Sequence, residues 1–353
     1  MPSVPSTQRV WAVKHPLKKD CSNLTLESRP VQQPQGTQVL VKVRAVSLNA
    51  RDVQIRTYPA PVQVQDGIIG GSDAAGDVIC VGDAATRFKV GDKVISLFAT
   101  GWLHGEHDDS YQTRGLGGGI DGVLQEYFLC DEQALVTMPT HMSYEEASTL
   151  PVAALTAWHA LWEVPGCVLI PGQTVLVLGT GGVSMAAAQF ALAAGCKVIA
   201  TSSSDDKLEK IKQLGVHAGV NYRNHPEWHD EVIKANGGRG VDHVIEVGGR
   251  GTLVRSIRAT RPLGHVWIIG YMSDYQTESE ERPEYAKEIL YTQAVVHGIV
   301  CGSRDMCENM VRASEAKQIH PVVDKVFNFE DTVKAYQYLD SGAHFGKVCI
   351  SLD

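Results

Sequence analysis

A glycine-rich loop offers the clearest chemistry in this sequence. The stretch LVLGTGGVSMA from Leu176 to Ala186 follows an apolar run and opens a helical pattern. Its loop residues are Gly179, Thr180, Gly181, Gly182 and Val183. Gly179 permits a tight turn, Gly181 lets the backbone approach a pyrophosphate, and the first helical amides attract negative charge. Ser184 replaces the third glycine of the usual pattern, and a purely structural turn is the alternative. The loop predicts a dinucleotide site.

The end of the next strand candidate indicates which dinucleotide binds. An acid there would hold the ribose hydroxyls of NAD, but none occurs before Asp205, where a helix begins. Hydroxyl groups and a lysine suit a 2′-phosphate better, because they supply hydrogen bonds and positive charge. The residues expected to hold this phosphate are Ser202, Ser203, Ser204, Lys207 and Tyr222. The alternative is that the serines only cap the helix. The sequence favours NADPH.

The stretch IGGSDAAGDVICVG from Ile69 to Gly82 has two aspartates but no histidine. It could be a metal site, a phosphate loop or a turn between strands. The cysteines are Cys21, Cys80, Cys130, Cys167, Cys196, Cys301, Cys307 and Cys349. No two of them form a CxxC pair, so neither a zinc ribbon nor a redox motif is indicated. We expect buried thiols and no metal ligands.

The surrounding pattern predicts an α/β protein with two kinds of domain. From about residue 35 to 135, short β-runs alternate with glycine, and Val41 and Val43 should face the core between exposed Lys42 and Arg44. Ser143 and Glu146 form a capping box. From Thr174 onward, strands and helices alternate, which predicts a parallel sheet covered on both faces. The expected domains are 1–145 and 146–300, with 301–353 completing the first.

Composition excludes several other classes of protein. The 353 residues suit two domains, and 44% hydrophobic with 20% charged residues is typical of a globular chain. The net charge of −8 argues against a nucleic-acid partner or an anionic membrane surface. Apolar runs are shorter than the roughly 20 residues of a membrane helix, and the N-terminus lacks a signal pattern. We expect a cytoplasmic location.

Taken together, these residues resemble the medium-chain dehydrogenase/reductase superfamily over nearly the whole chain. The resemblance rests on the order of a β-rich region, the GTGGV loop, VDHVIEVGG and PVVDKVFNFEDTVKAYQYLDSGAHFGKV. It is strongest to the quinone-oxidoreductase-like and zinc-free alcohol-dehydrogenase-like branches. It implies a GroES-like catalytic domain built from both chain ends around a Rossmann domain, usually in a dimer or a tetramer, and we expect a homodimer.

The resemblance also locates the positions that bind zinc in some family members, and in this chain those positions hold other residue types. Zinc-bearing members have Gly-His-Glu where this chain has Gly71-Ser72-Asp73, and a cysteine where it has Asn49, three residues before Asp52. Amide and hydroxyl groups are poor zinc ligands. The region that holds a four-cysteine lobe in the family, residues 101–116, has no cysteine. Its histidines, His104 and His107, are expected in a solvated loop. No metal is expected.

The resemblance supplies the remaining candidate residues. It implies cofactor contacts at Asn49, Thr156, Gly248, Gly270, Ile299, Ser303, Gly346 and Lys347, which could instead be ordinary helix, core or turn positions. It places the segment 49–61 along the substrate, where Asn49 would hold a ribose or a carbonyl. Tyr58 would donate to the substrate oxygen, or else pack in its loop. Asp73 would lie near the cofactor or only fix a turn.

Without zinc, the favoured chemistry is hydride transfer from NADPH to an enone, enal or quinone. The negative charge that develops on such a substrate is spread over several atoms and needs only hydrogen-bond donors. A zinc-free alcohol or carbonyl dehydrogenase is one alternative, and a non-catalytic NADPH-binding protein is another, since fold does not decide function.

Overall fold

The computed structural model describes residues 4–18, 20–57, 64–108, 113–271 and 284–352. The chain divides into two compact units. The first comprises Met1–Leu155 and Cys301–Asp353, and the second comprises Thr156–Val300. The second unit is therefore an insertion within the chain of the first.

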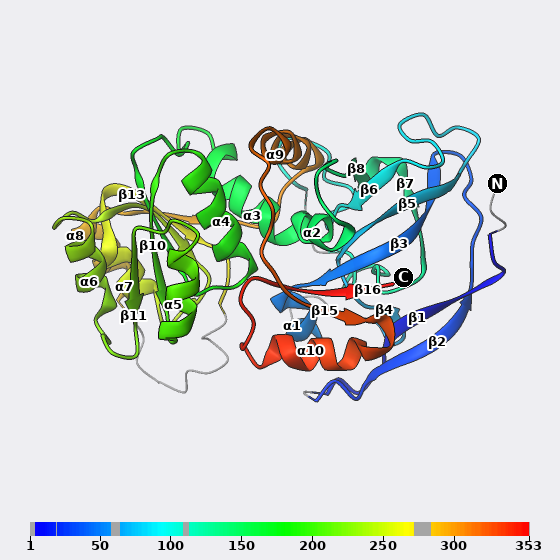
Figure 1. Cartoon of the computed structure of the whole chain (residues 1–353), viewed down its shortest axis with the longest axis horizontal. Helices are drawn as coiled ribbons and strands as arrows, with labels where there is room; N and C mark the ends of the chain where they lie inside the picture. Colours follow the sequence, from blue (N-terminus) through cyan, green and yellow to red (C-terminus); the bar gives the residue numbers. More distant parts are fainter. Residues whose placement is uncertain (1–3, 19, 58–63, 109–112, 272–283, 353) are drawn as a thin grey trace. The chain divides into compact units, whose positions relative to one another are not determined.

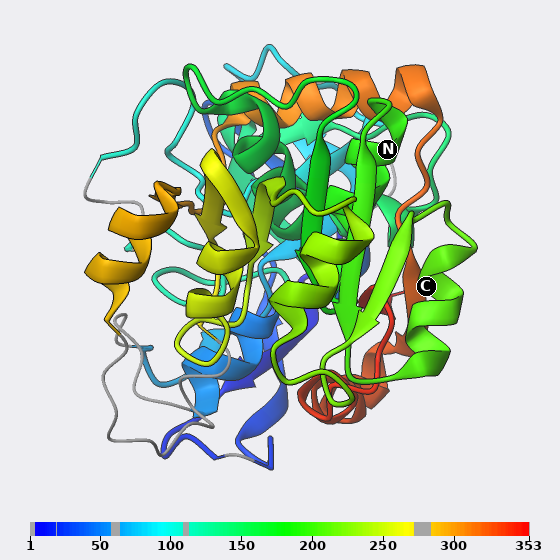
Figure 2. The same cartoon turned by 90° about the vertical axis from the view of Figure 1, so that its left-hand side faces the viewer.

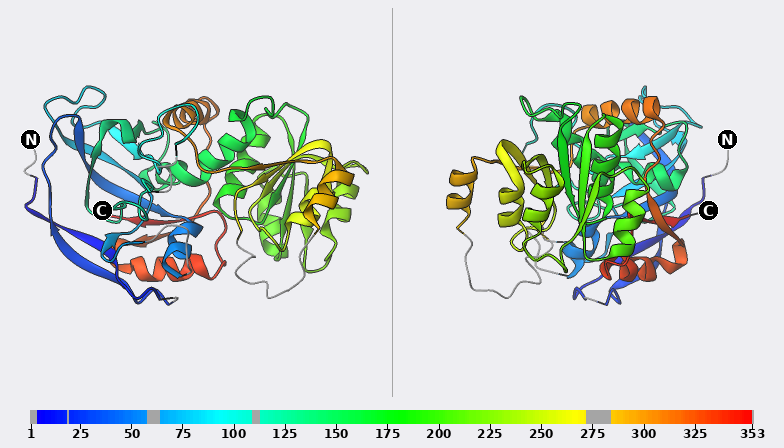
Figure 3. Two further views of the ribbon diagram at one scale, coloured as in Figure 1. Left: turned by 180° about the vertical axis from the view of Figure 1, so that it is seen from behind. Right: turned by 60° about the vertical axis from the view of Figure 1, so that its left-hand side comes forward.

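The first unit is rich in strands. They are β1 (Thr7–Val13), β2 (Leu24–Pro30), β3 (Gln38–Leu48), β4 (Ile68–Ile69), β5 (Asp73–Val81), β6 (Lys93–Ser96), β7 (Tyr127–Asp131), β8 (Leu135–Thr137), β15 (Val323–Asn328) and β16 (Lys347–Ser351). Within the described residues they form a sheet of order β2-β1-β4 and a larger sheet of order β15-β16-β3-β5-β6-β8, in which β7 also pairs with β3. The antiparallel pair of β1 and β2 is seen from behind in Figure 3.

The strand β16 connects the two ends of the chain. It pairs antiparallel with β3 and parallel with β15, so residues about 300 positions apart lie side by side (Figure 1). Val41 and Val43 of β3 are buried as predicted. Lys42 and Arg44 are only half-buried rather than exposed, because Arg44 Nε donates to Asp77 Oδ2 at 2.7 Å on the neighbouring strand.

Short helices join or cover these strands. They are α1 (Ala50–Thr57), η1 (Glu132–Ala134), α2 (Tyr144–Ser148), η2 (Leu150–Ala154), α9 (Arg304–Lys317), η5 (Phe329–Asp331) and α10 (Thr332–Asp340). The predicted capping box is confirmed at α2. Ser143 Oγ accepts from Glu146 N at 3.2 Å, and Glu146 Oε2 accepts from Ser143 N at 2.9 Å.

The second unit contains the predicted parallel sheet. Its strands are β9 (Thr174–Leu178), β10 (Lys197–Ser202), β11 (Ala218–Asn221), β12 (Val241–Glu246), β13 (Thr260–Ile268) and β14 (Val295–Gly298). Their order is β11-β10-β9-β12-β13-β14 (Figure 2). The order reverses at β9, so the loop after β9 lies at the point where such sheets bind nucleotides.

Helices of the second unit follow the strands. They are α3 (Leu155–Trp158), which crosses the unit boundary, η3 (His159–Glu163), α4 (Gly182–Ala193), α5 (Asp205–Lys212), α6 (Trp228–Ala235), α7 (Leu253–Ala259) and α8 (Tyr285–Thr292). Helices α4 and α5 pack on β9, β10 and β11, whereas α6, α7 and α8 contact one another in sequence. Right-handed crossovers on either side of β9 place these two groups on opposite faces of the sheet.

The boundary between the units falls about ten residues later than the sequence indicates. Residues 146–155 were expected in the second unit but belong to the first. The reason is packing against the first unit: Ser148 Oγ contacts Cys349 Sγ at 3.9 Å, and Val152 N donates to Asp73 Oδ2 at 3.2 Å. Residues 301–353 pack with the first unit, as the sequence suggested.

Among the residues that the structure describes, no helix combines the length and the apolar character needed to span a bilayer.

Candidate functional site

The glycine loop joins β9 to α4 in the second unit. Gly179 has a φ of +71°, a conformation that favours glycine, and Gly181 is the N-cap of α4. No side chain caps this helix, and a Cβ built at Gly179 or Gly181 would have no atom within 4 Å. Uncapped amides beside open space fit the negatively charged pyrophosphate of a dinucleotide.

Ser184 occupies the place of the third glycine. Its hydroxyl donates to Leu178 O at 2.6 Å, and the residue is buried. The hydrogen bond joins the first turn of α4 directly to the end of β9. A serine is therefore accommodated because its polar atom finds a partner in the preceding strand.

The hydroxyls after β10 have local structural roles. Ser204 is the N-cap of α5 and accepts from Lys207 N at 3.3 Å, while Ser202 Oγ accepts from Ser204 N at 3.2 Å. The capping interpretation therefore describes Ser204. Each of these hydroxyls can still donate its own proton to another group. Tyr222 follows β11, is 42% exposed and donates its backbone N–H to Ser202 O at 3.1 Å.

Glu246, at the end of β12, is a residue of this region that the sequence analysis missed. It is fully buried and accepts from Gly248 N at 2.7 Å, from Gly249 N at 3.0 Å and from Thr252 Oγ1 at 2.6 Å. Ser256 Oγ also donates to it. Burial raises the pKa of Glu246, and the hydrogen bonds oppose that rise. The sequence did contain a signal for this residue, because an acid at the end of a buried strand is unusual.

Glu246 therefore fixes the backbone on which two predicted glycines depend. A Cβ at Gly248 would lie 2.3 Å from Thr252 Oγ1, and one at Gly270 would lie 2.6 Å from Val247 O. Packing alone requires glycine at both positions.

In the first unit, a buried polar cluster forms where β3, α1, β5 and β16 meet. It consists of Asn49, Asp52, Ser72, Asp73 and Lys347. Lys347 Nζ donates to Asn49 Oδ1 at 2.5 Å and to Leu48 O at 2.7 Å, and lies 4.0 Å from Asp73 Oδ2.

The amide and hydroxyl groups extend this network. Asn49 Nδ2 donates to Ser72 Oγ at 3.2 Å, and Ser72 Oγ donates to Asp52 Oδ1 at 3.4 Å. Asp52 Oδ2 accepts from Asn49 N at 2.8 Å, which fixes the start of α1. Asp73 Oδ2 accepts from Val152 N of η2, so this bond joins β5 to η2 rather than fixing a local turn, and no described residue donates to Asp73 Oδ1.

Burial dominates the electrostatics of the cluster. It raises the pKa of Asp73 to about 6 and raises the pKa of Asp52, with Lys347 or Arg51 opposing the rise. Burial lowers the pKa of Lys347, and Asp73 and Asp52 oppose that change. The ammonium and the two carboxyl groups therefore depend on one another for their charge.

The donor set of this cluster does not fit a catalytic zinc. The positions to which the family resemblance assigns a cysteine and a histidine ligand hold Asn49 and Ser72, neither of which offers a thiolate or an imidazole. The amide oxygen of Asn49 already accepts from an ammonium group. The ammonium group of Lys347 thus already lies among the side chains that would have to bind a metal ion.

The other predicted residues are placed as follows. Thr156, Ile299 and Ser303 are buried, and Ser303 Oγ caps α9 by accepting from Met306 N at 3.3 Å. Gly346 has a φ of +89°, and a Cβ there would lie 2.3 Å from Val322 O, so a turn before β16 explains this glycine. Tyr58 lies outside the described residues. Among the described groups, neither His104 nor His107 joins a metal-type cluster.

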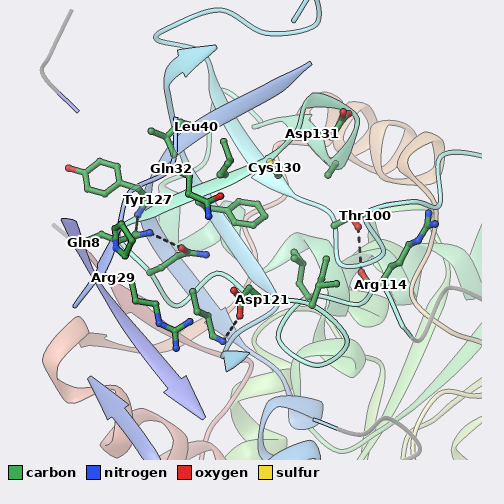
Figure 4. A pocket seen from close by; sticks show the side chains of 18 of the residues that line it. Gln8, Arg29, Gln32, Leu40, Thr100, Arg114, Asp121, Tyr127, Cys130 and Asp131 are labelled. Atoms are coloured by element: carbon green, nitrogen blue, oxygen red, sulfur yellow. Dashed lines mark hydrogen bonds between the residues drawn. The ribbon is translucent and has the colours of Figure 1, made fainter. Parts of the chain in front are cut away.

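The first unit also contains a cavity of about 510 Å³ (Figure 4). Arg29, Asp121 and Gln125 line one part of it, while Thr100 lies beside Arg114, whose carbonyl oxygen accepts from the Thr100 hydroxyl at 3.4 Å. None of the residues predicted for cofactor or substrate binding lines this cavity.

The fold and the loop define a protein with a nucleotide-binding unit, and comparison with known proteins identifies it as an oxidoreductase and specifies the family. Residues 35–140 match the Alcohol dehydrogenase GroES-like domain family, and residues 182–316 match the Zinc-binding dehydrogenase family. A Schizosaccharomyces pombe protein, "Zinc-type alcohol dehydrogenase-like protein C1773.06c", is 44% identical over 318 residues, which cover 90% of this chain and 91% of that protein. The chain belongs to the medium-chain dehydrogenase/reductase superfamily, whose members bind a nicotinamide cofactor.

Two further relatives show the range of names within the family. The crystal structure of a Sinorhizobium meliloti 1021 protein described as an alcohol dehydrogenase has a TM-score of 0.89 and 35% identity, covering 99% of this chain and 100% of that one. The human protein "Quinone oxidoreductase" is 25% identical over 315 residues, covering 88% of this chain and 87% of that protein.

Proposed function

We propose that this protein is an NADPH-dependent reductase that works without a catalytic zinc and reduces the activated C=C bond of an enone, enal or quinone. The observation that carries the proposal is the cluster around Lys347. Its ammonium group donates to Asn49 Oδ1 at 2.5 Å, where zinc-bearing relatives have a metal ligand.

The lack of a thiolate or an imidazole at Asn49 and Ser72 narrows the substrate class. A metal stabilises the localised charge of an alkoxide by several kcal/mol. Without it, a conjugated acceptor is favoured, because the negative charge of its enolate is delocalised before any protein group acts. When bound, NADPH would supply the hydride that adds to the β-carbon, and a proton then adds to the α-carbon.

The chain's own groups would orient and stabilise this reaction. Asn49, held by Lys347 and Ser72, is fixed in one orientation and is our candidate for a contact with the ribose or the substrate. Tyr58 is our candidate donor to the substrate oxygen. The hydroxyls of Ser202, Ser203 and Tyr222, with Lys207, are proposed to bind the 2′-phosphate.

A carbonyl reductase is the second candidate, because two of the relatives carry alcohol-dehydrogenase names. In that case hydride would add to the carbonyl carbon, and the product would be an alcohol. A chain that binds NADPH without turnover is the third candidate, and it predicts no oxidation of NADPH by any acceptor.

One experiment separates these functions. An enal is supplied with NADPH, and the product is identified by mass and NMR. We expect the saturated aldehyde, with consumption of one NADPH per double bond reduced. Predominant allylic alcohol would overturn the proposal in favour of the carbonyl reductase. A panel of enones, quinones and aldehydes that leaves NADPH unoxidised would support the binding protein.

A further inference from the structure

Three side chains of types that commonly bind transition metals lie close together in the second unit. They are Cys167, in the turn after η3, His265 of β13 and His297 of β14. One potential ligand atom from each lies within 4.8 Å of the others, and all three residues are half-buried. Within the described residues, no other histidine, cysteine or carboxylate group forms such a cluster.

We propose that Cys167, His265 and His297 form a zinc-binding site with three protein ligands. Thiolate and imidazole are the ligands that Zn²⁺ prefers, and three protein ligands leave a fourth position for water or another donor. The site belongs entirely to the second unit and is independent of the proposed reaction.

The distances between the potential ligand atoms support this assignment. His265 Nδ1 lies 3.2 Å from His297 Nε2, and Cys167 Sγ lies 4.0 Å from the same nitrogen. In a tetrahedral zinc site, bond lengths of about 2.0 Å to nitrogen and about 2.3 Å to sulfur separate two nitrogens by roughly 3.3 Å and nitrogen from sulfur by roughly 3.6 Å. The two measured separations therefore lie within about 0.4 Å of the tetrahedral values, and the ligand atoms of Cys167 and His265 lie within 4.8 Å of each other.

Aromatic stacking fixes both imidazoles in place. The ring of Trp267, which is fully buried, lies 4.3 Å from that of His297 and 5.4 Å from that of His265, with interplanar angles of 23° and 21°. His265 also lies against His243, at 5.1 Å between ring centroids. Rigid packing of this kind lowers the entropy that a ligand loses on binding a metal.

The neighbouring histidine shows that not every imidazole of this stack can serve as a ligand. His243 Nδ1 accepts from Trp267 Nε1 at 3.1 Å, so its Nε2 carries the proton and donates to Gln173 Oε1 at 3.1 Å. Both nitrogens are used. By contrast, His265 Nδ1 and His297 Nε2 point at each other and toward a thiol.

A network of hydrogen bonds without metal is the competing explanation. One imidazole would donate to the other, and the thiol would interact weakly with His297. That arrangement predicts no affinity for Co²⁺ or Zn²⁺ above that of ordinary surface groups, so metal titration distinguishes it from the proposal.

The test uses the full-length protein, freed of metal by a chelator and titrated with Co²⁺. We expect a single Co²⁺ per chain, visible d–d absorption of tetrahedral intensity and a thiolate-to-cobalt charge-transfer band. Zn²⁺ should displace the Co²⁺ and bleach both signals. Cys167→Ser should abolish the charge-transfer band, and both Cys167→Ser and His297→Ala should weaken metal binding at least ~10-fold, since each removes a ligand.

Cys80→Ser is the matched control, because Cys80 is also a half-buried free thiol but lies in the first unit. It should leave both bands unchanged. Far-UV circular dichroism confirms that each variant is folded, and His297→Asn replaces His297→Ala if the latter fails to fold. Failure of the wild-type protein to bind one Co²⁺, or a charge-transfer band that persists in Cys167→Ser, would overturn the proposal.

Discussion

The two units differ in how their polar groups are satisfied. In the first unit, Lys347 donates to Asn49 and lies 4.0 Å from Asp73, so a cation of the chain itself lies beside the position to which the family resemblance assigns a metal ligand. In the second unit, the glycine loop has uncapped amides beside open space, and Cys167 converges with two histidines without a carboxylate in the cluster. The Lys347 cluster contains its own cation. The glycine loop and the cluster of Cys167 with two histidines are instead proposed to bind a dinucleotide and a metal ion.

Whether a polar group already has a partner within the protein indicates whether its role is structural or in binding. A polar group whose partner is another side chain contributes to folding, and its loss leaves a buried charge uncompensated. A group that faces open space contributes little until a ligand arrives. Changes in the Lys347 cluster should therefore lower stability, whereas changes at Gly181 of the glycine loop, or at Cys167, His265 and His297, should mainly weaken binding.

The largest effect is expected for Lys347→Met. Removing the ammonium leaves Asp73 buried without the cation that lies 4.0 Å away, whereas Asp52 keeps Arg51 at 3.5 Å, and the free energy of unfolding should fall by about 3–5 kcal/mol. Urea unfolding measures it. Lys334→Met is the control, because Lys334 forms an exposed ion pair with Asp331 and should change stability by no more than about 1 kcal/mol. If Lys347→Met and Lys334→Met lowered the free energy of unfolding by similar amounts, the buried cluster would be no more important for stability than an exposed ion pair.

If Lys347→Met does not fold, the double variant with Asp73→Asn tests the same point. Removing both charges should recover part of the lost stability, because the uncompensated carboxylate is then gone. No recovery would show that the lysine acts through packing of its aliphatic chain rather than through its charge.

The second prediction concerns pH. Because the folded pKa of Asp73 is about 6 against an ordinary 3.8, the folded chain holds more protons than the unfolded chain between these values. Asp73 therefore makes the free energy of unfolding fall as pH rises through this window, by roughly 2–3 kcal/mol in total. Urea unfolding of wild type and Asp73→Asn between pH 4 and pH 7 isolates this contribution as their difference. A difference that does not change with pH would contradict the raised pKa.

The third prediction contrasts two glycines of the second unit. A Cβ at Gly181 meets open space, so Gly181→Ala should keep its melting temperature but bind NADPH and NADH at least ~10-fold more weakly, about 1.4 kcal/mol. A Cβ at Gly248 would lie 2.3 Å from Thr252 Oγ1, which Glu246 holds in place, so Gly248→Ala should lose about 1–3 kcal/mol of stability. Calorimetry and cofactor titration measure both. The reverse pattern would refute the assignment of a phosphate loop.

The smallest effect is expected for Lys207→Ala. Loss of a charged hydrogen bond to the 2′-phosphate should weaken NADPH binding by about 1–2 kcal/mol and leave NADH binding nearly unchanged. Fluorescence titration with both cofactors measures it. Lys212→Ala, which removes a lysine from the same helix that lies 3.4 Å from Glu209, serves as the control. Equal losses for the two cofactors would show that Lys207 does not bind the phosphate.

Local signals predicted the parallel sheet and the loop well. Strand–helix alternation and the GTGG turn depend on residues near one another in the sequence, and β9 through β14 lie where the pattern placed them. The unit boundary was less predictable, because contacts of residues 145–152 with Asp73 and Cys349 are formed across long sequence separations.

The two polar clusters show why sites are harder to predict than elements. Lys347 reaches Asn49 from almost 300 residues away, and nothing in the sequence near either residue indicates the contact. Cys167, His265 and His297 occur singly, without metal-ligand spacing, so the sequence predicted buried thiols and no metal ligands. The pairing of β12, β13 and β14 brings His243, His265, Trp267 and His297 onto one stack.

The position of β16 has a consequence for the order in which the protein matures during synthesis. This strand lies between β15 and β3, and residues 156–300 must be translated before it. The second unit can therefore begin to fold on the ribosome while the first still exposes one edge of β3. Until Lys347 leaves the exit tunnel, Asp73 lacks the ammonium group that lies 4.0 Å away in the folded unit, and the first unit stays incomplete. Chaperones that shield exposed strand edges would have most to do in this interval.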